Sequence, residues 1–143
     1  MSPVDRDVIR RKLARIVKSL QRIREIRERS LDDYLANEDL QAIMERQLEL
    51  AIGAAVDLNA HLLVQSGFAV PADAFTSFLE VATELQAVPV ALAQRLAPAT
   101  GLRNRLAHTY DDIDPAKVYA GLRDALEAFP AYVAAIEGYL SRS

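Results

Sequence analysis

The segment IRRKLARIVKSLQRI, residues 9–23 of a chain of 143 amino acids, sets the fold class. Its apolar residues recur at alternating intervals of four and three positions, the spacing of one continuous stripe on an α-helix. These residues are Ile9, Leu13, Ile16, Leu20 and Ile23. Pro3 suits the first turn of such a helix, so we expect a long amphipathic helix that ends near Arg29. A stripe of this length needs other helices to cover it.

The rest of the chain repeats helical periods and shows no sustained strand period. Ser30 is predicted to cap a short helical turn, and a second long helix should run from about Asn37 to a left-handed stop at Gly67. A third helix should place Phe75, Phe78, Leu79, Ala82 and Leu85 in the core. A fourth helix should begin at Pro89 and be kinked or interrupted by Pro98, and a last helix should begin at Asp114 and Pro115. We therefore predict a single all-α domain over residues 1–143, an up-down bundle of four to five helices.

Basic residues are concentrated at the start of the chain. Residues 1–29 contain ten Lys or Arg and four Asp or Glu, so this segment carries +6 while the remainder carries -9. Such segregation is typical of a surface for a polyanion or an acidic partner, and it makes Arg11, Arg15 and Arg22 candidate RNA-binding residues. A solvated helix face beside an acidic neighbour explains the same pattern equally well.

The composition excludes several classes of function. Without cysteine the chain has no disulfide, thiolate metal site or cysteine nucleophile. No apolar run approaches the roughly 20 residues that cross a bilayer, and no secretory signal pattern is present, so we expect a cytoplasmic protein without membrane contact. A glycine-rich phosphate loop, a glycine-flanked serine and a zinc-type histidine pair are also missing. We therefore expect no metal site and no cofactor.

Residues 103–110, Arg-Asn-Arg-Leu-Ala-His-Thr-Tyr, gather the candidate catalytic groups. At about 100° per residue on a helix, Arg103, Asn104 and His108 fall within one arc that can face a cleft. Arginine presents a planar fork to phosphate oxygens, histidine moves protons near neutral pH, and an asparagine amide can orient an imidazole or hold a phosphate. Tyr110 is expected just past the helix end, with its hydroxyl accessible.

The second predicted long helix carries the other histidine. Asp57 and His61 lie four positions apart and share a helix face. As a metal pair they lack a third ligand, so we expect a structural role, or a supporting role near the cleft. Small residues at positions 53–55 of this helix would let another helix approach closely, as in a tight packing or dimer contact.

The arrangement Arg103, four residues, His108, one residue, Tyr110 resembles the signature of the HEPN superfamily. It is similar in particular to the HepT-like toxins that pair with MntA-like minimal nucleotidyltransferase antitoxins. The resemblance extends beyond the motif, because residues 45–52 and 55–63 look like the second long helix of that family, and the Gly-Leu pair before the motif also fits. It therefore covers most of the chain.

This resemblance implies the toxin of a type VII-like toxin–antitoxin system, a metal-independent endoribonuclease that acts on RNA, in particular tRNA. It further implies neutralisation when the nucleotidyltransferase antitoxin transfers AMP to Tyr110. We assign Arg103 to phosphate and transition-state charge, His108 to proton transfer and Asn104 to orientation. Because RNA cleavage uses both a base and an acid while one motif supplies one histidine, we expect a two-fold homodimer.

Two alternatives stay open at this point. The chain could be a non-catalytic helical subunit that presents a nucleotide or substrate to a minimal nucleotidyltransferase or acts as its scaffold. It could also be a degenerate HEPN dimer with a structural function only. Cleavage of RNA separates both alternatives from the enzyme.

Overall fold

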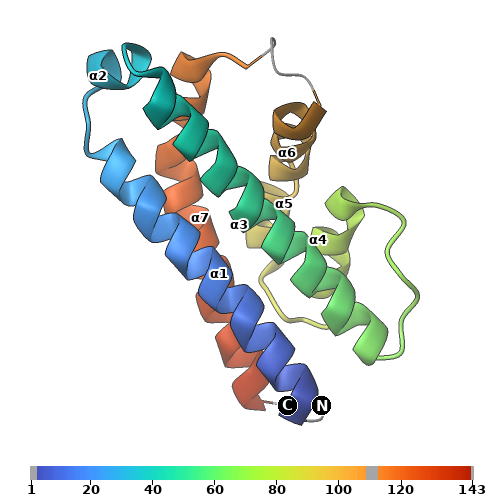
Figure 1. Ribbon diagram of the computed structural model, residues 1–143. Helices are drawn as coiled ribbons and strands as arrows, with labels where there is room; N and C mark the ends of the chain where they lie inside the picture. Colours follow the sequence, from blue (N-terminus) through green and yellow to red (C-terminus); the bar gives the residue numbers. More distant parts are fainter. Residues whose placement is uncertain (1–2, 109–112, 143) are drawn as a thin grey trace.

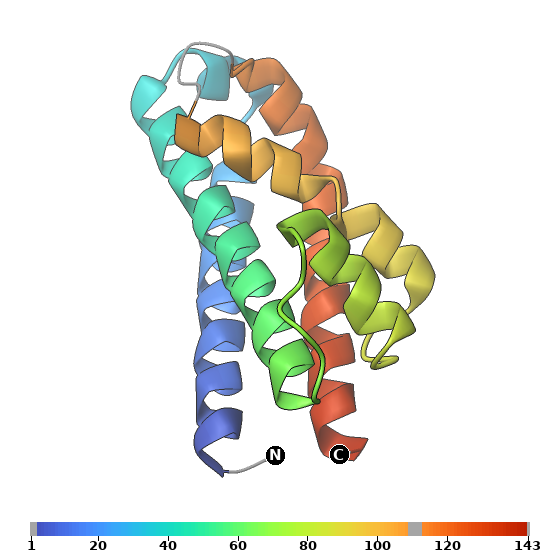
Figure 2. The ribbon, with the colours of Figure 1, turned by 90° about the vertical axis from the view of Figure 1, so that its right-hand side faces the viewer.

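The computed structural model describes residues 3–108 and 113–142, and every regular element in these ranges is an α-helix. The helices are α1 (Pro3–Arg27), α2 (Leu31–Leu35), α3 (Glu38–Gln65), α4 (Ala74–Thr83), α5 (Val90–Leu96), α6 (Ala99–His108) and α7 (Pro115–Arg142). The long helices α1, α3 and α7 run the length of the molecule, and the short helices α4, α5 and α6 lie along one side of them (Figures 1 and 2). The predicted all-α class is confirmed. None of the described helices is long and apolar enough to span a membrane.

The predicted stripe of α1 forms its contact with the rest of the bundle. All five stripe residues of 9–23 are buried, and α1 packs against both α3 and α7. The guanidinium of Arg6 donates to the carbonyl oxygen of Leu140 at 3.1 Å, which ties the start of α1 to the end of α7. The basic residues of α1 consequently lie on its outer face and along its borders with α3 and α7.

Capping residues and backbone breakers set the helix boundaries. The side chains of Ser30 and Asn37 accept hydrogen bonds from the first turns of α2 and α3, each at 3.1 Å, and Gly67 follows α3 with a φ of +93°. Pro98 divides the expected fourth helix into α5 and α6, because proline has no N–H to donate and its ring clashes with the preceding turn. This division, with the short α2, gives seven helices in the described ranges instead of four to five.

One predicted core residue is exposed. Phe75 retains 46% of its accessible surface, whereas Phe78, one turn later, is fully buried. Phe75 lies in the first turn of α4, directly after the loop, and the apolar period alone does not show where a short helix meets the core. The packed side of α4 begins at Ser77 and Phe78.

A buried polar chain joins α7, α3 and α4. The hydroxyl of Tyr132 donates to the Oδ1 atom of Asn59, the Nδ2 atom of Asn59 donates to the Oγ atom of Ser77 at 3.2 Å, and Ser77 donates to the carbonyl oxygen of Ala74. Burial raises the pKa of Tyr132 well above its ordinary value, so this hydroxyl stays a donor. The chain of bonds fixes the rotation of α3 relative to its neighbours, and α3 forms the floor of the site described next.

Candidate functional site

The motif helix α6 lies across α3 and is attached to the core by its leucines. Leu106 is buried and Leu102 is partly buried against the same core, and α6 contacts α3 and α4. At the Pro98 junction, Thr100 Oγ1 donates to the carbonyl oxygen of Ala97 at 2.9 Å. This attachment turns the Arg103 side of α6 toward α3.

Arg103 lies against the one position of α3 where no side chain is present. A Cβ atom at Gly53 would be 3.2 Å from Nε of Arg103 and 3.6 Å from its Nη2 atom, so the guanidinium group occupies the space that any other residue would fill. The Nε–H group is buried and has no hydrogen-bond partner among the described residues. A buried, unpaired donor of a cationic group is costly, so packing against α3, and not a hydrogen bond of this N–H group to a described residue, holds the guanidinium in place.

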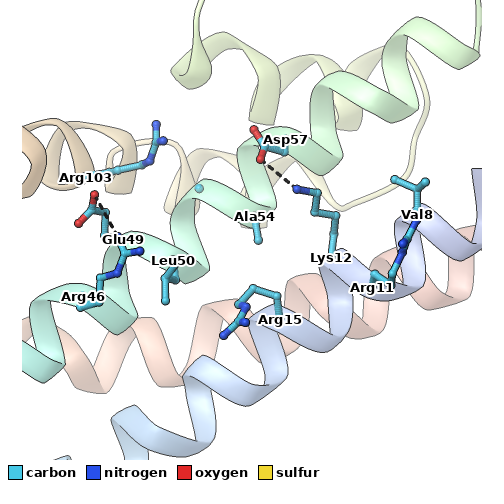
Figure 3. A pocket seen from close by; sticks show the side chains of 11 residues that line it. Val8, Arg11, Lys12, Arg15, Arg46, Glu49, Leu50, Ala54, Asp57 and Arg103 are labelled. Atoms are coloured by element: carbon cyan, nitrogen blue, oxygen red, sulfur yellow. Dashed lines mark hydrogen bonds and ion pairs between the residues drawn. The ribbon is translucent and has the colours of Figure 1, made fainter.

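A cleft of about 600 Å³ opens beside Arg103. Helix α3 provides its floor, with Leu50, Gly53 and Ala54 in the middle. Helix α1 provides the wall on the other side of this floor from Arg103 (Figure 3). The lining residues are Val8, Arg11, Lys12, Arg15, Arg46, Glu49, Leu50, Gly53, Ala54, Asp57 and Arg103. The cleft thus brings the motif arginine together with the basic first helix, across a strip of small side chains.

The cleft is positive although the whole protein is negative. Five basic and two acidic side chains line it, a formal charge of +3, against -3 for the chain. Lys12 pairs with Asp57 at 3.2 Å, and a longer contact of 3.8 Å joins Arg46 and Glu49. The basic lining residues that form no ion pair with a described residue are Arg11, Arg15 and Arg103. The unneutralised charge therefore consists of three arginines.

The other motif residues lie outside this cleft. Asn104 and His108 are exposed on α6, with His108 as the last residue of the helix, and neither lines the cleft. Arg103, Asn104 and His108 are expected on one arc of the helix, but only Arg103 lies against α3. The arc is wider than the face of α6 that packs against α3. Tyr110 lies outside the described residues.

The other candidate residues named from the sequence also lie partly in the cleft and partly outside it. Asp57 lines the cleft and is paired with Lys12, while His61 is half-buried with its Nε2 atom unpartnered among the described residues. No group of three or more His, Asp or Glu side chains in the described ranges could hold a metal ion. Arg22 pairs with Glu25 at 2.9 Å and lies outside the cleft, unlike Arg11 and Arg15.

Sequence reasoning missed the role of Gly53. A glycine inside a helical pattern signals close approach of another group, and the small residues at 53–55 by themselves predict a surface for a second helix. In the structure the approaching group at Gly53 is a side chain, the guanidinium of Arg103. Lys12 and Arg46, which also line the cleft, carried no signal beyond their charge.

Comparisons with known proteins agree with this architecture. Residues 16–136 match the Ribonuclease HepT-like family. The chain is 38% identical over 140 residues to the tRNA nuclease HepT of Aphanizomenon flos-aquae (strain 2012/KM1/D3), covering 98% of this chain and 95% of the relative.

Two solved structures share the fold. One is the tri-AMPylated Shewanella oneidensis HEPN toxin in complex with MNT antitoxin, with a TM-score of 0.83, 22% identity, and coverage of 96% of this chain and 99% of that one. The other is a toxin–antitoxin with AMP-PNP, with a TM-score of 0.84, 23% identity, and coverage of 92% and 98%. With the family match over residues 16–136 and the relative at 38% identity, these findings place the protein: the chain belongs to the HepT-like ribonuclease family.

Proposed function

We propose that this protein is a metal-independent endoribonuclease that cleaves tRNA in the cytoplasm, as the toxin of a toxin–antitoxin pair. Family membership supports the ribonuclease class, and the relative named as a tRNA nuclease supports the substrate. The observation that carries the proposal is Arg103, a cation without an ion pair among the described residues, in a positive cleft of a negative protein. A permanent planar cation in that position suits a phosphate oxygen.

The proposed reaction is transphosphorylation of RNA. The 2′-oxygen attacks the adjacent phosphorus, the P–O5′ bond breaks, and the products carry a 2′,3′-cyclic phosphate and a 5′-hydroxyl. Arg103 stabilises the charge that develops on the non-bridging oxygens. His108 removes the 2′-hydroxyl proton or delivers a proton to the leaving 5′-oxygen, and Asn104 orients the imidazole or the phosphate. No step of this scheme requires a metal ion.

We further propose that the active form is a homodimer. His108 is exposed at the end of α6, and a two-fold axis near that end would bring a second His108 to serve as the complementary acid or base. Mixing wild-type subunits with an excess of His108→Ala subunits is expected to lower the activity per wild-type subunit, because a mixed dimer holds only one of the two histidines that the reaction needs. A fully active monomer would contradict the dimer.

The proposed regulator is an MntA-like nucleotidyltransferase antitoxin that transfers AMP to Tyr110. The motif position of Tyr110 and the AMPylated HEPN toxin of similar fold support this proposal. An added AMP brings negative charge and bulk next to the phosphate-binding residues and should repel RNA. With ATP and the antitoxin, the wild-type chain should gain the mass of AMP, and Tyr110→Phe should not gain it at that position.

A matched pair of arginine variants tests the enzyme. Arg105 lies on the same helix as Arg103, is exposed and does not line the cleft. With total tRNA and a chelator, Arg103→Ala should lose cleavage, whereas Arg105→Ala should keep it at unchanged fold and oligomeric state. Equal loss in both variants would remove the specific role of Arg103. Absence of cleavage by wild-type dimer would favour the non-catalytic subunit of a nucleotidyltransferase.

A further inference from the structure

We propose that the α1 wall of the cleft, through Arg11 and Arg15, binds backbone phosphates of the RNA that adjoin the phosphate held by Arg103. This inference rests on the proposed ribonuclease function and gives that site a second part. It defines which part of the basic helix α1 contacts the RNA substrate.

The charges of the cleft favour an extended anion. Arg11, Arg15 and Arg103 line one continuous cleft, and none of them forms an ion pair with a described residue. They approach from two helices on opposite sides of α3 (Figure 3). A single phosphate group at Arg103 would leave the two α1 arginines without a counter-charge, whereas a chain of phosphodiesters places one negative charge at each nucleotide.

The floor of the cleft favours RNA over an acidic protein surface. Gly53 and Ala54 are the smallest of the α3 residues that line the cleft, and with Leu50 they form a low, largely apolar floor between the cations. A nucleotide strand lying in this cleft would place its sugars over the apolar floor and its phosphates toward the arginines. The carboxylates of an acidic protein surface would match the arginines but would make no use of the apolar floor.

The ion pairs of the lining mark where the proposed contact ends. Lys12 is neutralised by Asp57 within the cleft. Farther along α1, Arg22 is neutralised by Glu25 and lies outside the cleft. The proposed contact therefore includes Arg11 and Arg15 but excludes Arg22, although all three belong to the same basic helix.

Salt-dependent RNA binding tests this assignment. His108→Ala protein, which is expected not to cleave, is titrated against a fluorescent single-stranded RNA at two salt concentrations, with anisotropy as the readout. The test variant adds Arg11→Ala and Arg15→Ala. The control variant adds Arg22→Ala and Arg24→Ala, which remove the same charge from the same helix outside the cleft. Thermal unfolding and gel filtration confirm that both variants keep fold and oligomeric state.

The expected result is a specific loss of salt dependence. Each phosphate contact adds about 0.7 to the slope of log affinity against log salt for a single strand. Losing two contacts lowers the slope by about 1.4, so a roughly fourfold rise in salt weakens the parent about sevenfold more than the cleft variant. The control variant should keep the slope of the parent.

Three results would overturn the proposal. If both double variants lower the salt slope equally, the effect is one of total charge. If neither variant changes the salt slope, RNA does not bind in the cleft. In a parallel pull-down of the same variants with the nucleotidyltransferase, retained RNA binding with loss of binding to that partner would make the cleft a protein-docking surface. Failure of the proposed ribonuclease function gives a different result. If the cleft variant loses RNA binding but wild type never cleaves RNA, the binding site is supported and the ribonuclease activity is contradicted.

Discussion

Replacing Gly53 with alanine should make the protein more stable and less active at once. The added methyl carbon would be 3.2 Å from Nε of Arg103, closer than ordinary van der Waals contact, so the guanidinium must shift by a few tenths of an ångström. In a helix interior alanine is favoured over glycine by about 0.5–1 kcal/mol, which corresponds to a rise in Tm of about 1–4 °C for a domain of this size. Displacement of a phosphate-binding group should lower kcat about tenfold, equal to ~1.4 kcal/mol of transition-state stabilisation.

The matched control is Gly121→Ala on α7, where a Cβ atom would meet nothing within 4 Å. It should give a similar gain in stability with unchanged kcat. The assay combines thermal unfolding with kcat and KM on tRNA for both variants. Wild-type kcat in Gly53→Ala would refute the reasoning, because Arg103 would then act without its contact to α3. An equal loss in Gly121→Ala would attribute the effect to helix rigidity.

Three further results are expected. Tyr132→Phe removes the donor to a buried amide oxygen and should lower the free energy of unfolding by about 1–3 kcal/mol, measured by chemical denaturation; an unchanged midpoint would contradict the buried chain. Asp57→Asn removes the ion-pair partner of Lys12 in the cleft and should raise the salt slope of RNA binding by about 0.7. An unchanged slope would show that Lys12 does not contact an RNA phosphate. The backbone N–H of Thr76, followed by its side chain, holds the pKa of Asp73 below its ordinary value. A depressed folded pKa gives stability above the unfolded pKa that is lost as pH falls through the folded value, so melting of Asp73→Asn should lack this acid dependence; an identical pH profile for wild type and Asp73→Asn would contradict it.

The bundle could be predicted because its signals are local. The α1 stripe, the caps at Ser30 and Asn37, and the left-handed stop at Gly67 each follow from the chemistry of a few neighbouring residues. The split at Pro98 was open between a kink and a boundary, because proline removes one hydrogen bond in either case. Exposure of Phe75 depends on where a short helix meets the core, which a local period does not contain.

The candidate site could be predicted only in part, for a geometric reason. The motif identified Arg103, but its contact with Gly53 depends on the crossing of α6 over α3. The basic helix offered Arg11, Arg15 and Arg22 as equals, and only the packing of α1 along α3 decides that the first two line the cleft. Interhelical crossings arise from side-chain packing between distant segments, so one-dimensional spacing cannot sort these residues.

The most direct test of the central claim is the chemistry of the RNA ends. Metal-free wild-type protein and His108→Ala are incubated in parallel with total tRNA and a chelator, and the fragment termini are identified. Wild type is expected to produce 2′,3′-cyclic phosphate and 5′-hydroxyl ends, and His108→Ala, with unchanged helical content and oligomeric state, is expected to produce none. Absence of cleavage by unmodified wild type, cleavage that requires a metal ion, or full cleavage by His108→Ala would contradict this claim.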